Sequence, residues 1–250
     1  MAHSSALITG ASSGIGAALA RRLAGEGTLV VLAARREDAL RELADSIAAA
    51  GGQARIEVLD VSDPERTEAR VRELDEELGL EVVVANAGIG GSRWGGQLQW
   101  EHCAKVIAVN VSGAVATLTG AIPGMVSRKR GVLVGVSSIA QYRGLPSSAT
   151  YCASKAFLST FLESLRIDLH SAGVAVVDVR PGFVDTPMTE GMKSKPFAVD
   201  VDDAAAIIAK GIARKRKVVA FPTPMKWVGH ALQVMPKNIY EPVVRKGRRR

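Results

Sequence analysis

The 250-residue chain contains only two cysteines, Cys103 and Cys152, which is too few for a disulfide framework. Its four histidines fall in no motif, and no group of Cys and His has the spacing of metal ligands. The sequence therefore predicts no metal site. The small number of cysteines fits a protein of the reducing cytosol, and we expect a cytoplasmic location.

A charged segment followed by an apolar run is missing from the first residues, so no secretory signal is expected there. Residues 106–127 carry no charge and are long enough to cross a bilayer. The same run contains Asn, Ser, Thr, Gly and Pro residues. This mixture favours a helix buried in a globular core or in a subunit interface over a membrane span.

Acidic residues are almost absent from the last part of the chain. Residues 205–250 contain 12 Lys and Arg but only one acidic residue, Glu241, whereas the formal net charge of the whole chain is +7. The excess of positive charge is therefore local and is not a property of the fold. Aromatic residues do not alternate with the basic ones, so no nucleic-acid partner is expected.

An apolar strand at residues 6–9 leads into a glycine-rich turn and then into a helical pattern at residues 17–23. Glycine permits a tight turn, and the first turn of a helix offers free N–H groups to a phosphate. The spacing is Gly-x-x-x-Gly-x-Gly and not the commoner Gly-x-Gly-x-x-Gly. A plain strand-to-helix turn is the alternative interpretation. The expected phosphate cradle consists of Gly10, Ser12, Ser13, Gly14, Ile15 and Gly16.

A second apolar strand, residues 28–33, is followed by Ala34, Arg35 and Arg36. An acidic residue at the end of this strand would bind the ribose 2′-hydroxyl of NAD, whereas arginines suit the 2′-phosphate of NADP. The two arginines could also simply begin the solvated face of the next helix. We interpret them as favouring NADP.

Strands and helices alternate along the rest of the chain. Further strands are expected at residues 54–59, 81–85, 131–136, 174–179 and 218–221, and helices between them. Alternation without a linker predicts an α/β fold, namely a single Rossmann-like doubly wound parallel sheet of about seven strands with helices on both faces. Residues 1–221 would form this domain, and residues 222–250 a basic, amphipathic, helical C-terminal extension of it.

Tyr151 and Lys155 lie four residues apart in a helix expected at about residues 150–171. This spacing places both side chains on one helical face. A tyrosine keeps its proton until about pH 10, and a nearby ammonium group lowers that pKa. The pair can therefore transfer protons, although an isolated Tyr-x-x-x-Lys is more often a solvated surface pair.

Several motifs occur together in order, and with them the chain resembles the short-chain dehydrogenase/reductase family over roughly residues 5–190. The motifs are the glycine-rich turn that begins at Thr9, Asn86-Ala87-Gly88, Asn110, Ser138, Tyr151 with Lys155, and Pro181-Gly182 with Thr186. Any one of them is weak evidence by itself. The set in this order is specific.

The resemblance implies a catalytic group of four residues. Tyr151 would exchange a proton with the substrate oxygen, and Ser138, rather than the adjacent Ser137, would hydrogen-bond the same oxygen. Lys155 would hold the nicotinamide ribose and lower the pKa of Tyr151. Asn110 would anchor a water molecule that links Lys155 to solvent. Cys152, beside the tyrosine, is interpreted as a packed thiol.

The resemblance also implies that NADP(H) is the cofactor and that it lies across the carboxyl ends of the strands. Asp60 and Val61 would border the adenine, and Thr186 would orient the nicotinamide amide. The remaining residues expected to bind the cofactor are Arg35, Arg36, Asn86, Ala87, Gly88, Tyr151, Lys155, Pro181, Gly182 and Val184.

The function expected from these residues is an NADP(H)-dependent oxidoreductase that interconverts a carbonyl and a secondary alcohol on a small-molecule substrate. Residues 187–199 would cover the substrate, with residues 89–94 and 140–145 beside it. Met188, Met192 and Phe197 would make the pocket apolar, although they also suit an ordinary mobile loop. The alternative is a non-catalytic NADP-sensing regulatory or binding protein on the same fold.

Two expectations concern assembly. The resemblance implies a homodimer or homotetramer paired through the helices that carry Asn110 and Tyr151. In the extension, an apolar stripe could pack on the substrate pocket or on a second subunit, lie on an anionic membrane surface, or belong to a disordered solvated end. The stripe consists of Trp227, Val228, Ala231, Leu232, Val234 and Met235, with Lys226 and Lys237 beside it.

Overall fold

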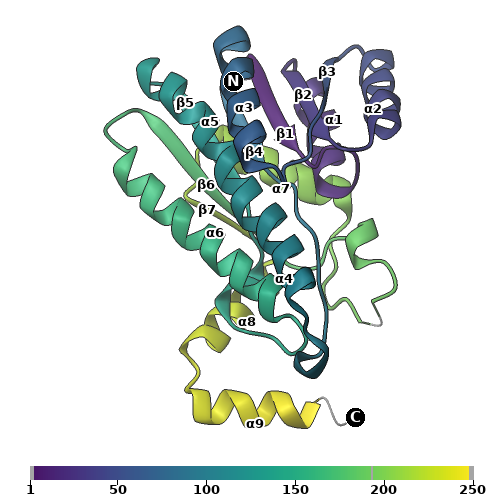
Figure 1. The fold of residues 1–250 in the computed structure, drawn as a ribbon, viewed down its shortest axis with the longest axis vertical. Helices are drawn as coiled ribbons and strands as arrows, with labels where there is room; N and C mark the ends of the chain where they lie inside the picture. Colours follow the sequence, from purple (N-terminus) through teal and green to yellow (C-terminus); the bar gives the residue numbers. More distant parts are fainter. Residues whose placement is uncertain (1–2, 193, 248–250) are drawn as a thin grey trace.

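The structure is a computed structural model that describes residues 3–192 and 194–247. Seven parallel strands form one sheet in the order β3-β2-β1-β4-β5-β6-β7 (Figure 1). This arrangement confirms the predicted Rossmann-like sheet. The strands are β1 Ser5–Thr9, β2 Leu29–Ala34, β3 Gln53–Val58, β4 Val82–Ala85, β5 Gly131–Val136, β6 Val174–Pro181 and β7 Val218–Phe221.

Helices cover both faces of the sheet, as predicted. The α-helices are α1 Gly14–Gly25, α2 Glu37–Ala49, α3 Pro64–Leu78, α4 Trp100–Ile107, α5 Ala114–Ser127, α6 Ala149–Asp168, α7 Val201–Ala213, α8 Thr223–Val234 and α9 Lys237–Gly247. Shorter turns are the 3₁₀ segments η1 Gly95–Gln97, η3 Ile139–Tyr142 and η4 Pro187–Thr189, and the π-helical segment η2 Ala108–Gly113.

The central strands are continuous apolar runs because each is buried on both faces. Neighbouring side chains point to opposite sides. Ile8 packs in the core on the side of α1, α2 and α7, and Leu7 in the core on the side of α3, α5 and α6. The sheet therefore separates two hydrophobic cores, and every crossover returns the chain so that the next strand begins at the same edge.

Polar residues mark where several helices begin. The Asp63 carboxylate accepts a hydrogen bond from Arg66 N at the start of α3, and Pro64 follows in the first turn. The Asp200 carboxylate likewise accepts from Asp202 N and starts α7. The side chain that caps α3 is therefore that of Asp63 and not that of the adjacent Ser62. The helix that carries Tyr151 and Lys155, α6, is shorter than predicted and ends at Asp168.

The uncharged run predicted as a core helix forms most of a continuous helical segment, α4-η2-α5. Trp100–Ser127 is long and apolar enough to cross a membrane, but half of its most apolar window is buried inside the protein. Glycines let α5 lie close against α3. A Cβ atom on Gly120 would stand 2.7 Å from Glu68 O in α3. Gly113, at the end of η2, lies equally close to the segment before α3, because a Cβ atom there would stand 2.4 Å from Val61 O.

Gly124, further along α5, makes the same close approach to an ion pair. Asp75 is only 2% exposed, and its Oδ1 lies 2.5 Å from Nη2 of Arg128. A Cβ atom on Gly124 would stand 1.8 Å from Asp75 Oδ2. We expect Gly124→Ala to lower the free energy of unfolding by about 3 kcal/mol, because it breaks a buried ion pair and separates two helices. Urea denaturation followed by circular dichroism measures this.

The matched control is Gly25→Ala at the end of α1, where an added Cβ atom meets nothing within 4 Å. This substitution should leave stability unchanged or raise it by about 0.5 kcal/mol. Equal midpoints for the two variants would show that the contact between α3 and α5 is not tightly packed.

Candidate active site

The glycine-rich turn brings the end of β1 against the end of β4. Gly10 has φ of 67°, and a Cβ atom there would stand 2.8 Å from Ala87 Cα. A Cβ atom on Gly16 would stand 2.5 Å from Gly10 O. The Asn86 side chain fixes the turn, because its Nδ2 donates to Thr9 O at 2.9 Å. The turn thus leaves its backbone open at the first turn of α1, as a phosphate cradle requires.

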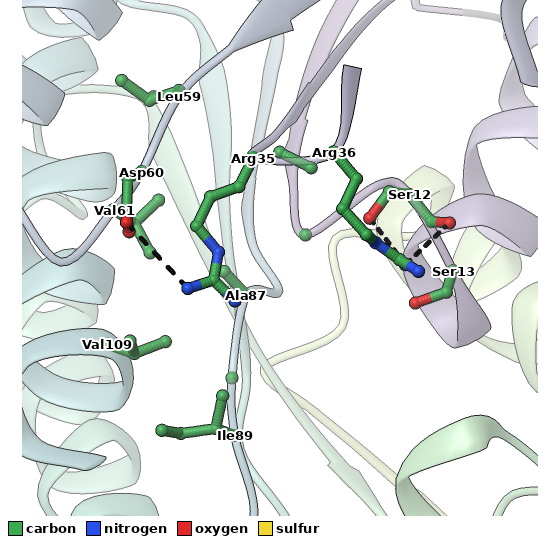
Figure 2. A pocket seen from close by; sticks show the side chains of 13 residues that line it. Ser12, Ser13, Arg35, Arg36, Leu59, Asp60, Val61, Ala87, Ile89 and Val109 are labelled. Atoms are coloured by element: carbon green, nitrogen blue, oxygen red, sulfur yellow. Dashed lines mark hydrogen bonds and ion pairs between the residues drawn. The ribbon is translucent and has the colours of Figure 1, made fainter. Parts of the chain in front are cut away.

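A cavity of about 240 Å³ lies between this turn and the ends of β2 and β3. Arg35 and Arg36 extend into opposite sides of it (Figure 2). Nη2 of Arg36 donates to Ser12 Oγ at 3.0 Å and to Ser12 O at 3.2 Å, and Arg35 Nη1 lies 4.0 Å from Asp60 Oδ2. Val61 lines the same cavity. Two exposed guanidinium groups therefore border a space at the strand ends.

A second cavity, of about 170 Å³, is lined by most of the other predicted residues, but Gly16 and Asn110 line neither cavity. Ser138, Tyr151 and Lys155 line the second cavity. The other predicted residues that line only this cavity are Gly14, Ile15, Asn86, Pro181, Gly182, Val184 and Thr186. Ser13, Ala87 and Gly88 line both cavities. The two spaces thus adjoin across the carboxyl edge of the sheet, where ligands of open α/β sheets bind.

Lys155 is a buried cation, only 5% exposed. Its Nζ donates to Val136 O, at the end of β5, at 2.8 Å. Burial lowers the pKa of Lys155 from the ordinary 10.5 to about 8, and the charge of Asp178 partly opposes this effect. The ammonium lies 5.7 Å from the centre of the Tyr151 ring. The positive charge is therefore held at a fixed place on the cavity wall.

The pKa of Tyr151 differs from the sequence prediction. Burial raises it, and a hydrogen bond with Ser138 opposes that rise. We expected Lys155 to lower it, but the ammonium is bonded to Val136 O instead of the phenol. Desolvation is therefore the largest influence on the pKa of Tyr151, and the phenol holds its proton at neutral pH.

The two adjacent serines have different environments, as the choice of Ser138 over Ser137 assumed. Ser138 Oγ accepts from Ala140 N at 3.1 Å and lies on the cavity wall, within hydrogen-bonding reach of Tyr151. Ser137 Oγ donates to Lys155 O at 2.9 Å and accepts from Ser159 Oγ at 2.9 Å. Ser137 is thus occupied in fastening β5 to α6.

Asn110 lies in the π-helical segment, a feature that the sequence did not indicate. Its Oδ1 accepts from Ile89 N at 2.8 Å, and its Nδ2 donates to Ile89 O at 3.1 Å and to Ser154 Oγ at 3.1 Å. A Cβ atom on Gly88 would stand 3.4 Å from Lys155 Nζ and 3.5 Å from Asn110 Oδ1. The side chain of Asn110 therefore fixes the loop after β4 beside the lysine.

A polar group near the site was missed by sequence reasoning. Asp178 is fully buried in β6, and its Oδ2 lies 2.7 Å from Arg180 Nη2. Arg180 Nη1 donates to the Tyr142 hydroxyl in η3 at 3.2 Å. Asp178 Oδ1 has no hydrogen-bond partner among the described residues. The charges in Asp178-Val179-Arg180 were the available signal, but only the sheet register places them behind Lys155.

Two further predictions from the sequence concerned Cys152 and metal ligands. Cys152 is buried, and burial raises the pKa of its thiol. Within residues 3–192 and 194–247, no group of three or more His, Cys, Asp or Glu side chains could hold a metal ion.

With this geometry established, the comparisons with known proteins identify the family. The short chain dehydrogenase family matches residues 4–196. An uncharacterized oxidoreductase from Myxococcus xanthus is 45% identical over 248 residues, which is 98% of each chain. The chain belongs to the short-chain dehydrogenase family and is an oxidoreductase of that type.

Two solved structures share the fold. A short-chain dehydrogenase from Sphingobium yanoikuyae in complex with NADPH aligns with a TM-score of 0.82 at 26% identity, covering 91% of each chain. An alcohol dehydrogenase from Thermococcus sibiricus, complexed with 5-hydroxy-NADP, aligns with a TM-score of 0.78 at 29% identity, covering 87% of this chain and 95% of that one. The family match ends at residue 196, so α7, β7, α8 and α9 lie outside it.

The lowered pKa of Lys155 predicts how stability depends on pH. Between pH 8 and 10.5 the folded lysine binds fewer protons than the unfolded one. The loss of folding stability caused by burying the charged lysine is therefore fully present below pH 8, and it disappears as the pH rises. Lys155→Met removes a penalty on the order of 3 kcal/mol at neutral pH. We therefore expect the stability of the mutant minus that of the wild type to decrease from pH 7.5 to 10 in urea melts.

A difference that stays constant across this range would show that Lys155 titrates at its ordinary pKa. The charged Lys155 ammonium would then have to pair with a negatively charged group that the structure does not show. Lys210→Met, at an exposed position on α7, serves as the control and should give a difference that does not change with pH.

Proposed function

We propose that the protein is an NADP(H)-dependent oxidoreductase that interconverts a carbonyl and a secondary alcohol. The observation that carries this proposal is the meeting of Ser138, Tyr151 and Lys155 on one cavity wall, beside the glycine-rich turn. Three groups that can donate hydrogen bonds to a substrate oxygen thus stand next to a cradle for a dinucleotide.

The cofactor choice is supported by the first cavity. Gly10 and Gly16 allow the glycine-rich turn to close tightly against the end of β4, and Arg35 and Arg36 border the cavity beside it with positive charge. The aligned structures from Sphingobium and Thermococcus contain NADPH and 5-hydroxy-NADP. When bound, NADP(H) supplies or accepts the hydride, and the protein positions the reacting groups.

Tyr151 is the proposed acid. Burial keeps its phenol protonated at neutral pH, so the hydroxyl can donate its proton to a carbonyl oxygen as that oxygen gains charge. Ser138 donates a hydrogen bond to the same oxygen, and the Lys155 ammonium stabilises the resulting phenolate. In the reverse direction the phenol must first release its proton, and the resulting phenolate then accepts the proton of the alcohol.

Asn110 and the segment after β6 complete the site. Asn110 holds Ile89 and Ser154 and so keeps Lys155 at its place beside Gly88. Met188 lines the catalytic cavity, and 49% of its surface is exposed. Because a flexible thioether adapts to varied apolar groups, we propose a substrate with an apolar body beside its carbonyl.

A non-catalytic NADP-sensing protein is the alternative, and turnover separates the two functions. We would follow NADPH oxidation with a panel of ketones, aldehydes and acyl-chain carbonyls. Binding of NADPH without turnover of any carbonyl or alcohol would favour the sensor.

Tyr151→Phe should reduce turnover by about 100-fold or more, because it removes the proposed acid without changing the ring. Affinity for NADPH, measured by fluorescence titration, should stay within about threefold, because the other residues expected to bind the cofactor are unchanged. Near-normal turnover in this variant would rule out Tyr151 as the proton donor.

Ser138→Ala and Ser137→Ala form a matched pair at adjacent positions. Loss of the Ser138 hydroxyl should lower kcat by about 100-fold, as for the loss of one oxyanion donor. Ser137 also lines the cavity, but its hydroxyl is bonded to Lys155 O and Ser159 Oγ of α6, so Ser137→Ala should mainly lower the melting temperature. Similar losses of kcat in both variants would contradict the separate roles.

Arg36→Gln should raise the KM for NADPH by about tenfold or more and leave that for NADH nearly unchanged, since a charged hydrogen bond to a 2′-phosphate is lost. Arg41→Gln on α2, where the arginine pairs with Glu37 on the surface, is the control. Steady-state kinetics with both cofactors measures the effect. Equal changes for NADPH and NADH would remove the argument for NADP.

Pairing of subunits stays a prediction. The helices expected at the interface expose apolar side chains, among them Ile107, Phe157 and Ile167. These side chains support a homodimer or homotetramer formed through α4, α5 and α6.

A further inference from the structure

The C-terminal extension carries an apolar face that points to solvent. The exposed residues of α8 include Pro224, Trp227, Val228, Ala231 and Val234, which share one side of the helix at i, i+3, i+4 and i+7 spacings and are here called the exposed stripe. Trp227 is 66% exposed and Val234 is 80% exposed. This face therefore differs from the usual surface helix, whose exposed side is polar.

The opposite side of α8 is fastened to the segment that follows Ser138. A Cβ atom on Gly229 would stand 2.4 Å from the Tyr142 ring, so the helix lies directly on that ring. His230 Nε2 lies 3.4 Å from the Tyr142 hydroxyl, and Arg143 Nη1 donates to Gln233 O at 3.4 Å. Because these contacts fix the rotation of α8, the exposed stripe is held outward.

Helix α9 is fastened in the same way. The Tyr240 hydroxyl donates to Gly144 O at 2.5 Å, and the Arg143 guanidinium lies 4.7 Å from the centre of its ring. Ile239 and Val243, four residues apart, remain more than half exposed. In Figure 1, α8 and α9 project from the lower end of the molecule, with α9 at its tip. Helix α9 thus adds two exposed aliphatic side chains to those of α8.

Positive charge accompanies these apolar residues. Residues 222–250 contain seven Lys and Arg and one acidic residue, Glu241. In the described part, Lys226 Nζ lies 5.8 Å from the centre of the Trp227 ring, and Lys237 and Arg245 are exposed on α9. An apolar face with cations around it has the composition of a helix that lies in the interface of an anionic membrane.

We propose that α8 and α9 bind the surface of a bilayer containing anionic lipids, with the exposed stripe, Ile239 and Val243 in the interfacial layer. The charge argues for lipid over a second copy of the chain. Two copies facing each other through this surface would bring together two segments that both carry excess positive charge, whereas anionic headgroups neutralise it.

The position of the extension relates this membrane contact to the catalytic cavity. Helix α8 follows the carboxyl end of β7, and η3, on which it packs, follows Ser138. The membrane contact would therefore lie at the same edge of the sheet as the catalytic cavity. A substrate with an apolar body could then reach the site from the lipid phase.

The test is sedimentation of the full chain with sucrose-loaded vesicles of phosphatidylcholine, either alone or mixed with phosphatidylglycerol. We expect binding to the mixed vesicles and its loss as salt rises. Val228→Asp should lower the partition coefficient by about tenfold or more, because it places a charge on the exposed stripe, which is the face that would enter the lipid. Lys237→Gln with Arg245→Gln should lower it by about fivefold per charge.

Ile207→Asp on α7 is the matched control, since Ile207 is also an exposed aliphatic residue on a helix, 38% exposed against 46% for Val228. It should partition as the wild type does. Thermal melts of each variant, followed by circular dichroism, establish that the fold is kept.

Three results would overturn the proposal. They are wild-type chain that stays in the supernatant with the mixed vesicles, equal partitioning of Val228→Asp and Ile207→Asp, and unchanged vesicle binding by Val228→Asp together with a smaller oligomer in sedimentation velocity. The last result would assign the exposed stripe to a second copy of the chain. None of these measurements requires turnover, so they are independent of the proposed reaction.

Discussion

The site depends on one buried cation and the carbonyl that holds it. Lys155 brings its ammonium to Val136 O, at the end of β5, and so joins α6 to the sheet where the strands end. Removing an ammonium from water costs several kcal/mol unless its donors are satisfied and opposite charge is near. Ser137 fastens the same helix to the same strand, and Asp178 supplies negative charge from β6. These interactions offset part of the cost of burying the ammonium, and they fix its position on the cavity wall.

Much of the fold could be predicted because its signals are local. Continuous apolar runs, Asp63 and Asp200 as caps and the glycine-rich turn determine strands, helix starts and the first crossover without knowledge of distant contacts. The residues around the two cavities could be named because their motifs resemble those of the short-chain dehydrogenase/reductase family and because parallel strands all end at one edge. Their roles in binding and catalysis remain predictions that the experiments above address.

The rest depends on contacts between distant segments. The pKa of Tyr151 is set by its burial, which i,i+4 spacing does not reveal. The role of Asp178 requires the pairing of β5 with β6, and the outward face of α8 requires the Tyr142 ring beneath Gly229. In each case the sequence identified a candidate residue or element at most, while the balance between solvation and charge was decided by the tertiary structure.

The wide turn between α4 and α5 has a further consequence. Val106 and Ala114 are both buried although they are eight residues apart, one more than the seven of two regular turns. The π-helical segment absorbs that additional residue, so the flanking helices keep a common inward side while Asn110 gains a place outside the regular ladder. Deleting one residue from this segment would restore a seven-residue spacing between Val106 and Ala114, and the buried side chains of both flanking helices would still point inward. The Asn110 side chain therefore reaches the loop after β4 while the helices on either side keep their packing.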